Sequence, residues 1–422
     1  MIDVRLFRDD RERVITALGR RGLSRQELER IMELERRRRE VVAEVEGLRA
    51  EQKVRSRAIG TAPPAERPRL IELASELKEP LRRAEEELEA LSKELAAELA
   101  AIPNLPDPEA PDGAEEDSVV VRLVGQAPAF DFPPRDHLEL LEAVGALDLA
   151  RAAKVSGARF YFLKGEGCLL ELALVRYALD VAMRHGHKPV IPPVLVRHDA
   201  MFGTGFFPTD EQQIFAVRDD DLYLVGTSEV PLAAMHMDEI LDEVPCRYVA
   251  FSTCFRREAG SYGKDTRGVF RVHQFDKVEL FSFVAADASP GEHERILAIE
   301  EEIMGGLGLH YRVVDIAVGD LGASAARKFD LEAWLHGQQA YRELTSCSNT
   351  TDYQARRLRV RRRGADGGTE LVHTLNGTAL AVSRTIIALV ETHQRGDGSV
   401  AVPEALVPYL GREVLFAGRG NR

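Results

Sequence analysis

Residues 248–283 are YVAFSTCFRREAGSYGKDTRGVFRVHQFDKVELFSF. Apolar and β-branched residues at both ends of this stretch predict two strands, Tyr248–Phe255 and Val269–Phe283, joined by a polar loop. Side chains two residues apart lie on the same face of a strand. The polar and aromatic residues that share one face by this rule are Arg271, His273, Phe275, Lys277 and Glu279. So polar a face is not a core, and we expect it to be either solvated or a polar ligand site.

Outside this stretch, short β-branched or aromatic runs alternate with helical patterns. Further strands are predicted at Arg159–Leu163, Lys188–Ile191, Ile214–Val217, Leu222–Val225, Tyr311–Val318, Lys328–Leu335 and Leu371–Leu375. Helices are predicted at Cys168–His185, Ser289–Leu307 and Thr378–His393. Several strands follow one another across short turns, which favours an antiparallel sheet over regular βαβ alternation. The predicted fold class is therefore α+β, an antiparallel sheet with flanking helices.

The N-terminal part of the chain has a different periodicity, which predicts an antiparallel coiled-coil hairpin over residues 27–101. Apolar residues recur at steps of three and four, as in a coiled-coil seam. They are Ile31, Leu34, Val41, Val45 and Leu48, and after Pro63 and Pro64 they are Leu70, Leu73, Leu77, Leu81, Ala84, Leu88, Leu91, Leu95 and Leu99. Pro80 lies inside the second predicted helix, where it should kink the rod.

Residues 103–113, PNLPDPEAPDG, contain four prolines and predict a stiff extended linker. We place the domain boundary here, with an N-terminal domain at 1–112 and a second domain at 113–422.

The composition describes an acidic chain with a real core. Of its 422 residues 45% are apolar and 30% charged, and the formal net charge is −13. This charge argues against a protein that coats nucleic acid or an anionic membrane with its whole surface. No run of 18 apolar residues occurs, and residues 1–14, MIDVRLFRDDRERV, do not resemble a signal peptide. The four cysteines lack the C-x-x-C spacing, so we expect reduced thiols in a cytoplasmic protein without zinc.

The tip of the predicted hairpin departs from the acidic average. Between Arg49 and Arg69 six basic residues and two acidic residues give a local charge of +4. Five of these basic residues lie nearest the turn: Lys53, Arg55, Arg57, Arg67 and Arg69. This tip is either a solvated coiled-coil face or a site that binds the phosphates of a nucleic acid.

Three further segments combine polar groups with strand or helix patterns. Gly226–Glu229 has the pattern of a helix start. Tyr341–Asn349 has the pattern of a strand that carries a carboxylate and hydroxyls, and Asn376–Arg384 that of a strand turning into a helix. No glycine-rich phosphate loop occurs, so any phosphate must be held by side chains. Each motif alone is weak, because an Arg-x-Glu on a strand is more often a surface ion pair.

Together, and in this order, these motifs resemble those of the seryl-tRNA synthetases, which are class II aminoacyl-tRNA synthetases. F-R-x-E at Phe255–Glu258 with RVHQFDKVE at 271–279 matches the family's motif 2, and HTLNGTALAVSR at 373–384 matches motif 3. The helix Leu169–Arg184 and the strand ending at Pro193 match motif 1. RELTSCSN at 342–349 and TSE at 227–229 match the serine-specific segments. The resemblance covers essentially the whole chain and includes the hairpin, which is similar to the family's tRNA-binding arm.

The resemblance implies that the chain ligates L-serine to tRNA(Ser) through a seryl-adenylate, with ATP and Mg²⁺ as cofactors. Arg256 would bridge the α-phosphate and the serine carboxylate, and Arg271 would hold the terminal phosphates. Glu258 would accept from the adenine amino group, with Phe275 on one side of the ring and Arg384 on the other. Glu343 and Ser346 would bind Mg²⁺. The further residues expected near ATP are Arg257, Val272, Leu344 and Thr345.

The resemblance also implies a polar pocket for the serine amine and hydroxyl, which is expected to reject analogues that lack the hydroxyl. Its residues would be Thr227, Ser228, Glu229, Arg256, Glu279, Asn376 and Thr378. His273 is expected to be structural, since this reaction needs no side-chain base. The implied partners are tRNA(Ser), with selenocysteine tRNA as a further candidate, and a second copy of the chain that packs on motif 1.

Two other functions stay open at this stage. A synthetase-like ligase could charge a carrier protein or serve a specialised pathway, but it would not need a hairpin with a basic tip. A non-catalytic scaffold could keep the fold, but it would be free to lose some of the charged residues at 256, 258, 271, 343 and 384.

Overall fold

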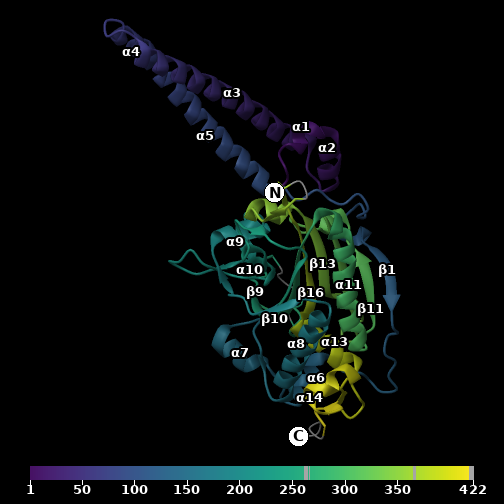
Figure 1. The fold of residues 1–422 in the computed structure, drawn as a ribbon. Coiled ribbons are helices and arrows are strands. Elements are labelled where there is room, and N and C mark those ends of the chain that lie inside the picture. Colours follow the sequence, from purple (N-terminus) through teal and green to yellow (C-terminus); the bar gives the residue numbers. More distant parts are fainter. Residues whose placement is uncertain (261–264, 266, 365–366, 418–422) are drawn as a thin grey trace. The chain divides into compact units, whose positions relative to one another are not determined.

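The computed structural model describes residues 1–260, 265, 267–364 and 367–417 (Figure 1). The chain divides into two compact units, Ile2–Pro103 and Asn104–Arg422 together with Met1. The division falls at the start of the proline-rich stretch, nine residues before the boundary predicted from composition. The reason is that residues after 103 are bonded into the second unit: the Asn104 amide donates to the backbone oxygens of Ser324 (2.9 Å) and Thr350 (2.8 Å).

The first unit is helical, and its main feature is the pairing of two long antiparallel helices. Its helices are α1 (Leu6–Asp9), α2 (Arg11–Arg20), α3 (Arg25–Thr61), α4 (Arg67–Ser75) and α5 (Lys78–Ala101). Helix α3 starts at a capping box, in which Ser24 and Glu27 satisfy each other's backbone N–H groups. Val41, Val45, Leu81 and Ala84 form the buried seam between α3 and α5. The predicted hairpin is thus confirmed, although Glu35 is buried where Leu34 was expected.

The second helical segment of the hairpin is interrupted near Pro80, as predicted, but the break lies before this residue. Helix α4 ends at Ser75 and α5 begins at Lys78, so Pro80 occupies the first turn of a new helix. Proline is tolerated there because the first N–H groups of a helix have no partner within the helix. The break therefore lies at residues 76–77, and Pro80 follows it.

The second unit is built on an eight-stranded sheet, in the order β1-β11-β12-β13-β16-β10-β9-β4. Its strands are β1 (Val119–Val124), β11 (Tyr311–Asp315), β12 (Arg327–Leu335), β13 (Ala340–Thr351), β16 (His373–Ala381), β10 (Gln274–Val284), β9 (Cys246–Phe255) and β4 (Lys188–Val190). All neighbours are antiparallel except β4 and β9. The predicted α+β class is therefore confirmed.

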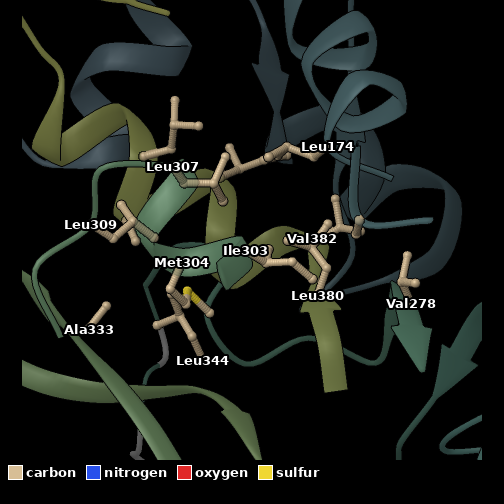
Figure 2. Close-up of a cluster of buried hydrophobic side chains, with 14 of the residues drawn as sticks. Leu174, Val278, Ile303, Met304, Leu307, Leu309, Ala333, Leu344, Leu380 and Val382 are labelled. Carbon is tan, nitrogen blue, oxygen red and sulfur yellow. The ribbon is translucent and has the colours of Figure 1, made fainter. Parts of the chain in front are cut away.

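Three helices pack on the sheet: α8 (Glu166–Arg184), α11 (Ser289–Gly306) and α13 (Val382–Thr392). Between these helices and the strands lies the main hydrophobic core, part of which is drawn in Figure 2. There Leu174 of α8 and Ile303 of α11 meet strand residues such as Val278, Leu344 and Leu380. Since this core occupies one face of the central strands, polar side chains that alternate with it must face the other way.

Smaller sheets and short helices complete the unit. The small strands are β2 (Leu147–Asp148), β3 (Phe162–Leu163), β5 (Leu195–Val196), β6 (Phe215–Ala216), β7 (Tyr223–Leu224), β8 (Ile240–Leu241), β14 (Arg361–Arg363), β15 (Thr369–Leu371), β17 (Val400–Ala401) and β18 (Val414–Leu415). The short helices are α6 (His137–Ala143), α7 (Leu149–Ser156), α9 (His198–Thr204), α10 (Glu229–Ala234), α12 (Tyr353–Leu358) and α14 (Val407–Leu410). Across the described part of the chain, each helix is too short or too polar to span a bilayer.

Two predicted boundaries near the polar face are wrong. Strand β10 begins at Gln274 rather than Val269, because the ladder with β9 pairs only Gln274 onward. Helix α13 begins at Val382 rather than Thr378, because residues 377–381 are still paired with β10. Arg384 therefore lies in the first turn of α13. Residues 261–264 and 266 of the predicted polar loop lie outside the described residues.

Candidate active site

The second unit carries a cavity lined by residues of β10, β13 and β16 and by Arg256, which follows the end of β9. The predicted site residues that line it are Thr227, Glu229, Arg256, Glu258, Arg271, Val272, Phe275, Glu279, Glu343, Leu344, Ser346, Asn376, Thr378 and Arg384. On β10 the lining residues Phe275, Lys277 and Glu279 alternate, as the two-residue period predicted. Residues as far apart in sequence as Thr227 and Arg384 thus contribute to one site.

One end of the cavity holds two buried carboxylates. The Asn376 amide donates to Glu229 Oε2 (3.0 Å) and to Glu279 Oε1 (3.4 Å), and Gln354 donates to Glu229 Oε1 (2.6 Å). Burial, and then the nearby Glu279, raise the pKa of Glu229 to about 7. Burial also raises the pKa of Glu279, against the opposing effect of its ion pair with Lys277. Two carboxylates and few cations suit a small ligand that carries an ammonium and a hydroxyl group.

The rest of the cavity is rich in arginine. The Arg256 guanidinium lies 5.3 Å from the centre of the Phe275 ring, and its Nε donates to the Gly226 backbone oxygen (3.2 Å). Arg271 is paired with Glu258 (2.7 Å). Such planar cations beside an aromatic face suit a nucleotide, whose phosphates take bidentate donors and whose base stacks.

Arg384 contacts Glu343 and the Phe270 ring. Its Nη1 donates to the Glu343 backbone oxygen (2.9 Å), and its guanidinium lies 4.5 Å from the centre of the Phe270 ring. Phe275 and Arg384 both line the cavity, and the Arg256 guanidinium lies over the Phe275 ring; that Phe275 and Arg384 enclose an adenine stays a prediction. Arg271 and Glu258, which are ion-paired here, are expected to contact different parts of ATP: Arg271 the terminal phosphates and Glu258 the adenine amino group.

A second hollow adjoins the first and shares Phe270, Arg271, Glu343 and Arg384 with it. Lys328 and Asp330 of β12 line this second hollow and form an ion pair (3.3 Å). Burial by itself would raise the pKa of Glu343, but Arg384, Lys328 and Arg256 together hold it below its ordinary value. Glu343 is therefore ionised at neutral pH.

These residues fit the Mg²⁺ site expected from sequence. Mg²⁺ prefers oxygen ligands and usually takes only one or two carboxylates beside substrate phosphates. Glu343 offers a charged carboxylate and Ser346 a hydroxyl, and both line the first cavity. Asp330 Oδ1, on the facing strand, is buried without a hydrogen-bond partner in the described part of the chain.

Three predicted residues lie outside the cavity lining. Arg257 lines a separate surface hollow with Tyr223 and Glu211, because it follows Arg256 and points the other way. Thr345 is buried on the opposite face of β13, near Glu300 of α11. The Ser228 hydroxyl is buried and faces no partner among the described residues. Strand alternation accounts for Thr345, while Arg257 lies beyond the end of β9. Neither side chain lines the cavity, and both stay predictions as ATP contacts.

The structural role expected for His273 agrees with its contacts. Its ring contacts Phe160 and Phe215, and its Nδ1 lies 3.0 Å from the Arg256 backbone oxygen. His273 does not line the cavity.

The cavity also contains residues that received no role from the sequence: Phe206, Phe270, Lys277, Ala381 and Ser383. Lys277 could have been found, because it lies on the polar face between Phe275 and Glu279. Phe270 could not, since only tertiary structure places its ring 4.0 Å from Arg342 and 4.5 Å from Arg384.

At the tip of the hairpin the five predicted tRNA contacts are not equivalent. Arg55 is paired with Glu51 (2.5 Å), and Arg67 donates to the Ala62 backbone oxygen (3.0 Å). Lys53, Arg57 and Arg69 have no ion-pair partner within the described residues, so their charges are available to a ligand.

Comparisons with known proteins agree with this geometry. Residues 1–106 match the family model of the seryl-tRNA synthetase N-terminal domain, and residues 214–393 match that of the tRNA synthetase class II core domain (G, H, P, S and T). A serine–tRNA ligase of Acidothermus cellulolyticus is 55% identical over 417 residues, which cover 98% of this chain and 99% of the relative.

Two solved structures are similar over 98% of the chain. Seryl-tRNA synthetase from Pyrococcus horikoshii, complexed with ATP, has a TM-score of 0.93 and 41% identity, and 99% of it is covered. The cytoplasmic serine–tRNA ligase of Naegleria fowleri, in complex with AMP, has a TM-score of 0.88 and 33% identity, and 98% of it is covered. By sequence, by fold and by the residues gathered in its cavity, the chain belongs to the seryl-tRNA synthetases, in the class II aminoacyl-tRNA synthetases.

Proposed function

We infer that this chain catalyses the ATP-dependent ligation of L-serine to tRNA(Ser). In the first step a serine carboxylate oxygen attacks the α-phosphorus of ATP, and pyrophosphate leaves. In the second step a ribose hydroxyl at the tRNA 3′ end attacks the seryl carbonyl carbon, and AMP leaves. The observation that carries this inference is a single cavity with an acidic end for serine and an arginine-rich end for the nucleotide.

The proposed catalysis depends on position and charge. Both steps gather negative charge on oxygen atoms, which preorganised cations stabilise without a covalent enzyme intermediate. Arg256 lies between the two ends of the cavity, close to Phe275 on one side and to the Gly226 backbone on the other. It is therefore the residue best placed to contact both the serine carboxylate and the α-phosphate.

Specificity for serine would come from the acidic end. A buried polar site rejects an analogue that cannot complete its hydrogen bonds far better than an apolar pocket rejects a missing methylene. Glu229 and Glu279 would receive the ammonium and the hydroxyl, while Asn376 holds both carboxylates in place. Alanine would leave one of these buried acceptors unpaired.

Glu343 and Ser346 are the residues that would hold Mg²⁺, which when bound supplies positive charge for the phosphates of ATP. Glu343 stays ionised because Arg384, Lys328 and Arg256 hold its pKa below its ordinary value. Arg271 and Arg384, which line both hollows, would orient the outer phosphates.

The helical hairpin is proposed to bind the tRNA. Lys53, Arg57 and Arg69 carry charges without ion-pair partners in the described chain, as phosphate contacts require. Selenocysteine tRNA is a second proposed substrate, and the cytoplasm is the proposed compartment.

A homodimer is proposed on the motif 1 side of the second unit. Several large apolar side chains there are exposed: Val155, Phe162, Leu169, Leu172 and Ile191, the last with 87% of its surface accessible. Exposed apolar side chains of this kind are what a subunit interface would bury. Sedimentation equilibrium should give twice the chain mass, and Leu172→Glu should give the monomer mass.

The activity is tested by ATP–pyrophosphate exchange with a panel of amino acids. Exchange should require serine and should be at least tenfold slower with threonine, cysteine, alanine or glycine. Absence of serine-dependent exchange in the wild-type chain would refute the proposed function. Exchange without transfer to any tRNA would point instead to a carrier other than tRNA.

A further inference from the structure

A buried aspartate faces the proposed metal ligands from the neighbouring strand. In the antiparallel register of β12 and β13, Asp330 lies directly opposite Ser346. Opposite residues of such a pair project to the same face, with Cβ atoms about 5 Å apart. Asp330 also lines the second hollow together with Glu343. It is therefore a neighbour of both residues that would hold Mg²⁺.

The two carboxylate oxygens of Asp330 have different surroundings. Oδ2 lies 3.3 Å from Lys328 Nζ, which fixes the orientation of the carboxylate. Oδ1 has no hydrogen-bond partner among the described residues, although the side chain is only 5% exposed. An unpaired polar atom in such a place is costly. We therefore expect a hydrogen-bond donor to contact Asp330 Oδ1 when the substrates and metal are bound.

Ser346 has the complementary requirement. A hydroxyl group has one proton and two lone pairs. When a lone pair is given to a cation, the proton needs an acceptor elsewhere, and the cation makes that proton a better donor. Hydrogen bonds of this kind orient metal ligands in many proteins.

We propose that Asp330 is a positioning residue of the metal site. Its Oδ1 accepts the hydroxyl proton of Ser346 and so turns a lone pair of Ser346 toward the divalent cation. Lys328 holds Oδ2 and keeps the carboxylate in place for this bond. The inference rests on the proposed function in one respect, that Glu343 and Ser346 bind Mg²⁺.

A simpler role is that Asp330 and Lys328 form only a structural ion pair. The two roles differ in how Asp330 and Ser346 depend on each other. A structural pair would affect folding whatever residue is at 346. A positioning residue that acts through the Ser346 hydroxyl should have little effect on the metal once that hydroxyl is removed.

A double-mutant cycle tests this dependence with a readout of metal binding rather than turnover. Mn²⁺ is titrated into the full chain saturated with an α,β-methylene analogue of ATP, and free Mn²⁺ is followed by electron paramagnetic resonance. The variants are Asp330→Asn, Ser346→Ala and the double variant. Asp330→Asn should weaken Mn²⁺ binding about 10- to 100-fold in the wild-type background. In the Ser346→Ala background, Asp330→Asn should weaken Mn²⁺ binding less than twofold.

The matched control is Glu332→Gln, which removes a carboxylate from the same strand and the same hollow. Glu332 lies opposite Glu343 in the register but is ion-paired with Arg312, and its change should alter Mn²⁺ affinity less than twofold. If Asp330→Asn does not fold, as judged by its melting curve, Asp330→Glu replaces it in the cycle with the same expectations.

Equal losses in both backgrounds, or no loss in either, would overturn the role of Asp330. A loss with Glu332→Gln as large as that with Asp330→Asn would overturn it too, because it would reflect general charge. If the wild-type chain with the analogue binds no Mn²⁺, the metal site of the proposed function fails, and the Asp330 inference fails with it. Serine-dependent exchange, measured separately, distinguishes that result from failure of the ligase activity itself.

Discussion

The glutamates of the helical hairpin and those of the cavity behave in opposite ways. Glu79 in α5 is exposed and accepts from Arg82 and Arg83, and these bonds lower its pKa to about 2. Glu229 in α10 is fully buried next to Glu279, and its pKa is raised to about 7. The side chain is the same, so burial and the sign of the nearest charge decide its behaviour.

This difference shows where each unit uses its charge. On the hairpin, arginines and glutamates three or four residues apart pair along one helix, as in Arg36 with Glu33. Such exposed pairs contribute little to stability. In the cavity, ionised groups are buried and their charges are only partly neutralised by partners. This burial is costly for folding, but it leaves the charges available to bind a ligand. We therefore expect mutations at cavity charges to have large effects on function, and mutations at hairpin pairs to have small ones.

The largest effect is expected for Arg256→Ala. Arg256 is the cation between the two ends of the cavity, and loss of a preorganised donor of this kind costs about 10²- to 10³-fold in rate. Serine-dependent ATP–pyrophosphate exchange should fall by about 10³-fold. The control is Arg257→Ala, the next residue along the chain, which points out of the cavity and should leave exchange within about threefold. Equal losses in the two variants would contradict the assignment.

The next largest effect is expected at the hairpin tip, where mutations should weaken tRNA binding without changing the exchange reaction of the second unit. Changing Lys53, Arg57 and Arg69 together to glutamine removes three unpaired charges that should contact phosphates. The affinity for tRNA(Ser), measured by filter binding at 0.1 M salt, should fall at least tenfold, and its salt dependence should become less steep. Exchange should not change. Undiminished tRNA binding would mean that the tip is only a solvated face.

A smaller effect is expected from pH, because Glu229 should titrate near neutrality. Its raised pKa of about 7 means that it is mostly protonated at pH 6 and mostly ionised at pH 8. Only the ionised form attracts the serine ammonium, with Glu279, Lys277 and Arg256 as the charged neighbours. The KM for serine should therefore fall about tenfold between pH 6 and pH 8. Glu229→Gln should raise KM and remove this pH dependence, and a dependence that persists would assign it to another group.

The smallest effect is expected at a hairpin ion pair. Arg37 of α3 and Glu87 of α5 are 2.7 Å apart across the helices, but both side chains are more than 40% exposed. Arg37→Ala should leave the urea midpoint of unfolding and the exchange rate unchanged within error, since solvent screens the pair. A clear drop in the midpoint would show that the hairpin depends on its charges and not only on its apolar seam.

Much of the site could be predicted because its residues follow local rules. The two-residue period of a strand was enough to bring Phe275, Lys277 and Glu279 to one face. Thr345 alternates with Ser346 on β13 and faces away from the cavity, whereas Arg257 lies beyond the end of β9 and lines another hollow. Alternation does not hold throughout the site, because Arg271 and Val272, and likewise Glu343 and Leu344, are consecutive residues that line the cavity together.

Boundaries were less predictable, because they depend on partners elsewhere in the chain. The run Thr378–Ala381 is compatible with a helix, but it remains in β16 because β10 supplies its hydrogen bonds. In the same way Asn104, which was predicted to be part of the linker, belongs to the second unit because its side-chain amide donates to the backbone oxygens of residues 324 and 350. Local propensity is overridden wherever a long-range ladder satisfies the backbone.

By itself, the sequence determined the helical hairpin with its basic tip, the α+β class of the second unit and the set of charged residues at the site, since these follow from periodicity, composition and motif. The tertiary structure alone decided which charges are enclosed together. Glu229 lies beside Glu279 and Arg384 beside Phe270 although each pair is distant in the chain, and the register of β12 and β13 sets Asp330 opposite Ser346. Electrostatic energies depend on distance and burial, and no stretch of sequence specifies either one until the sheet is assembled.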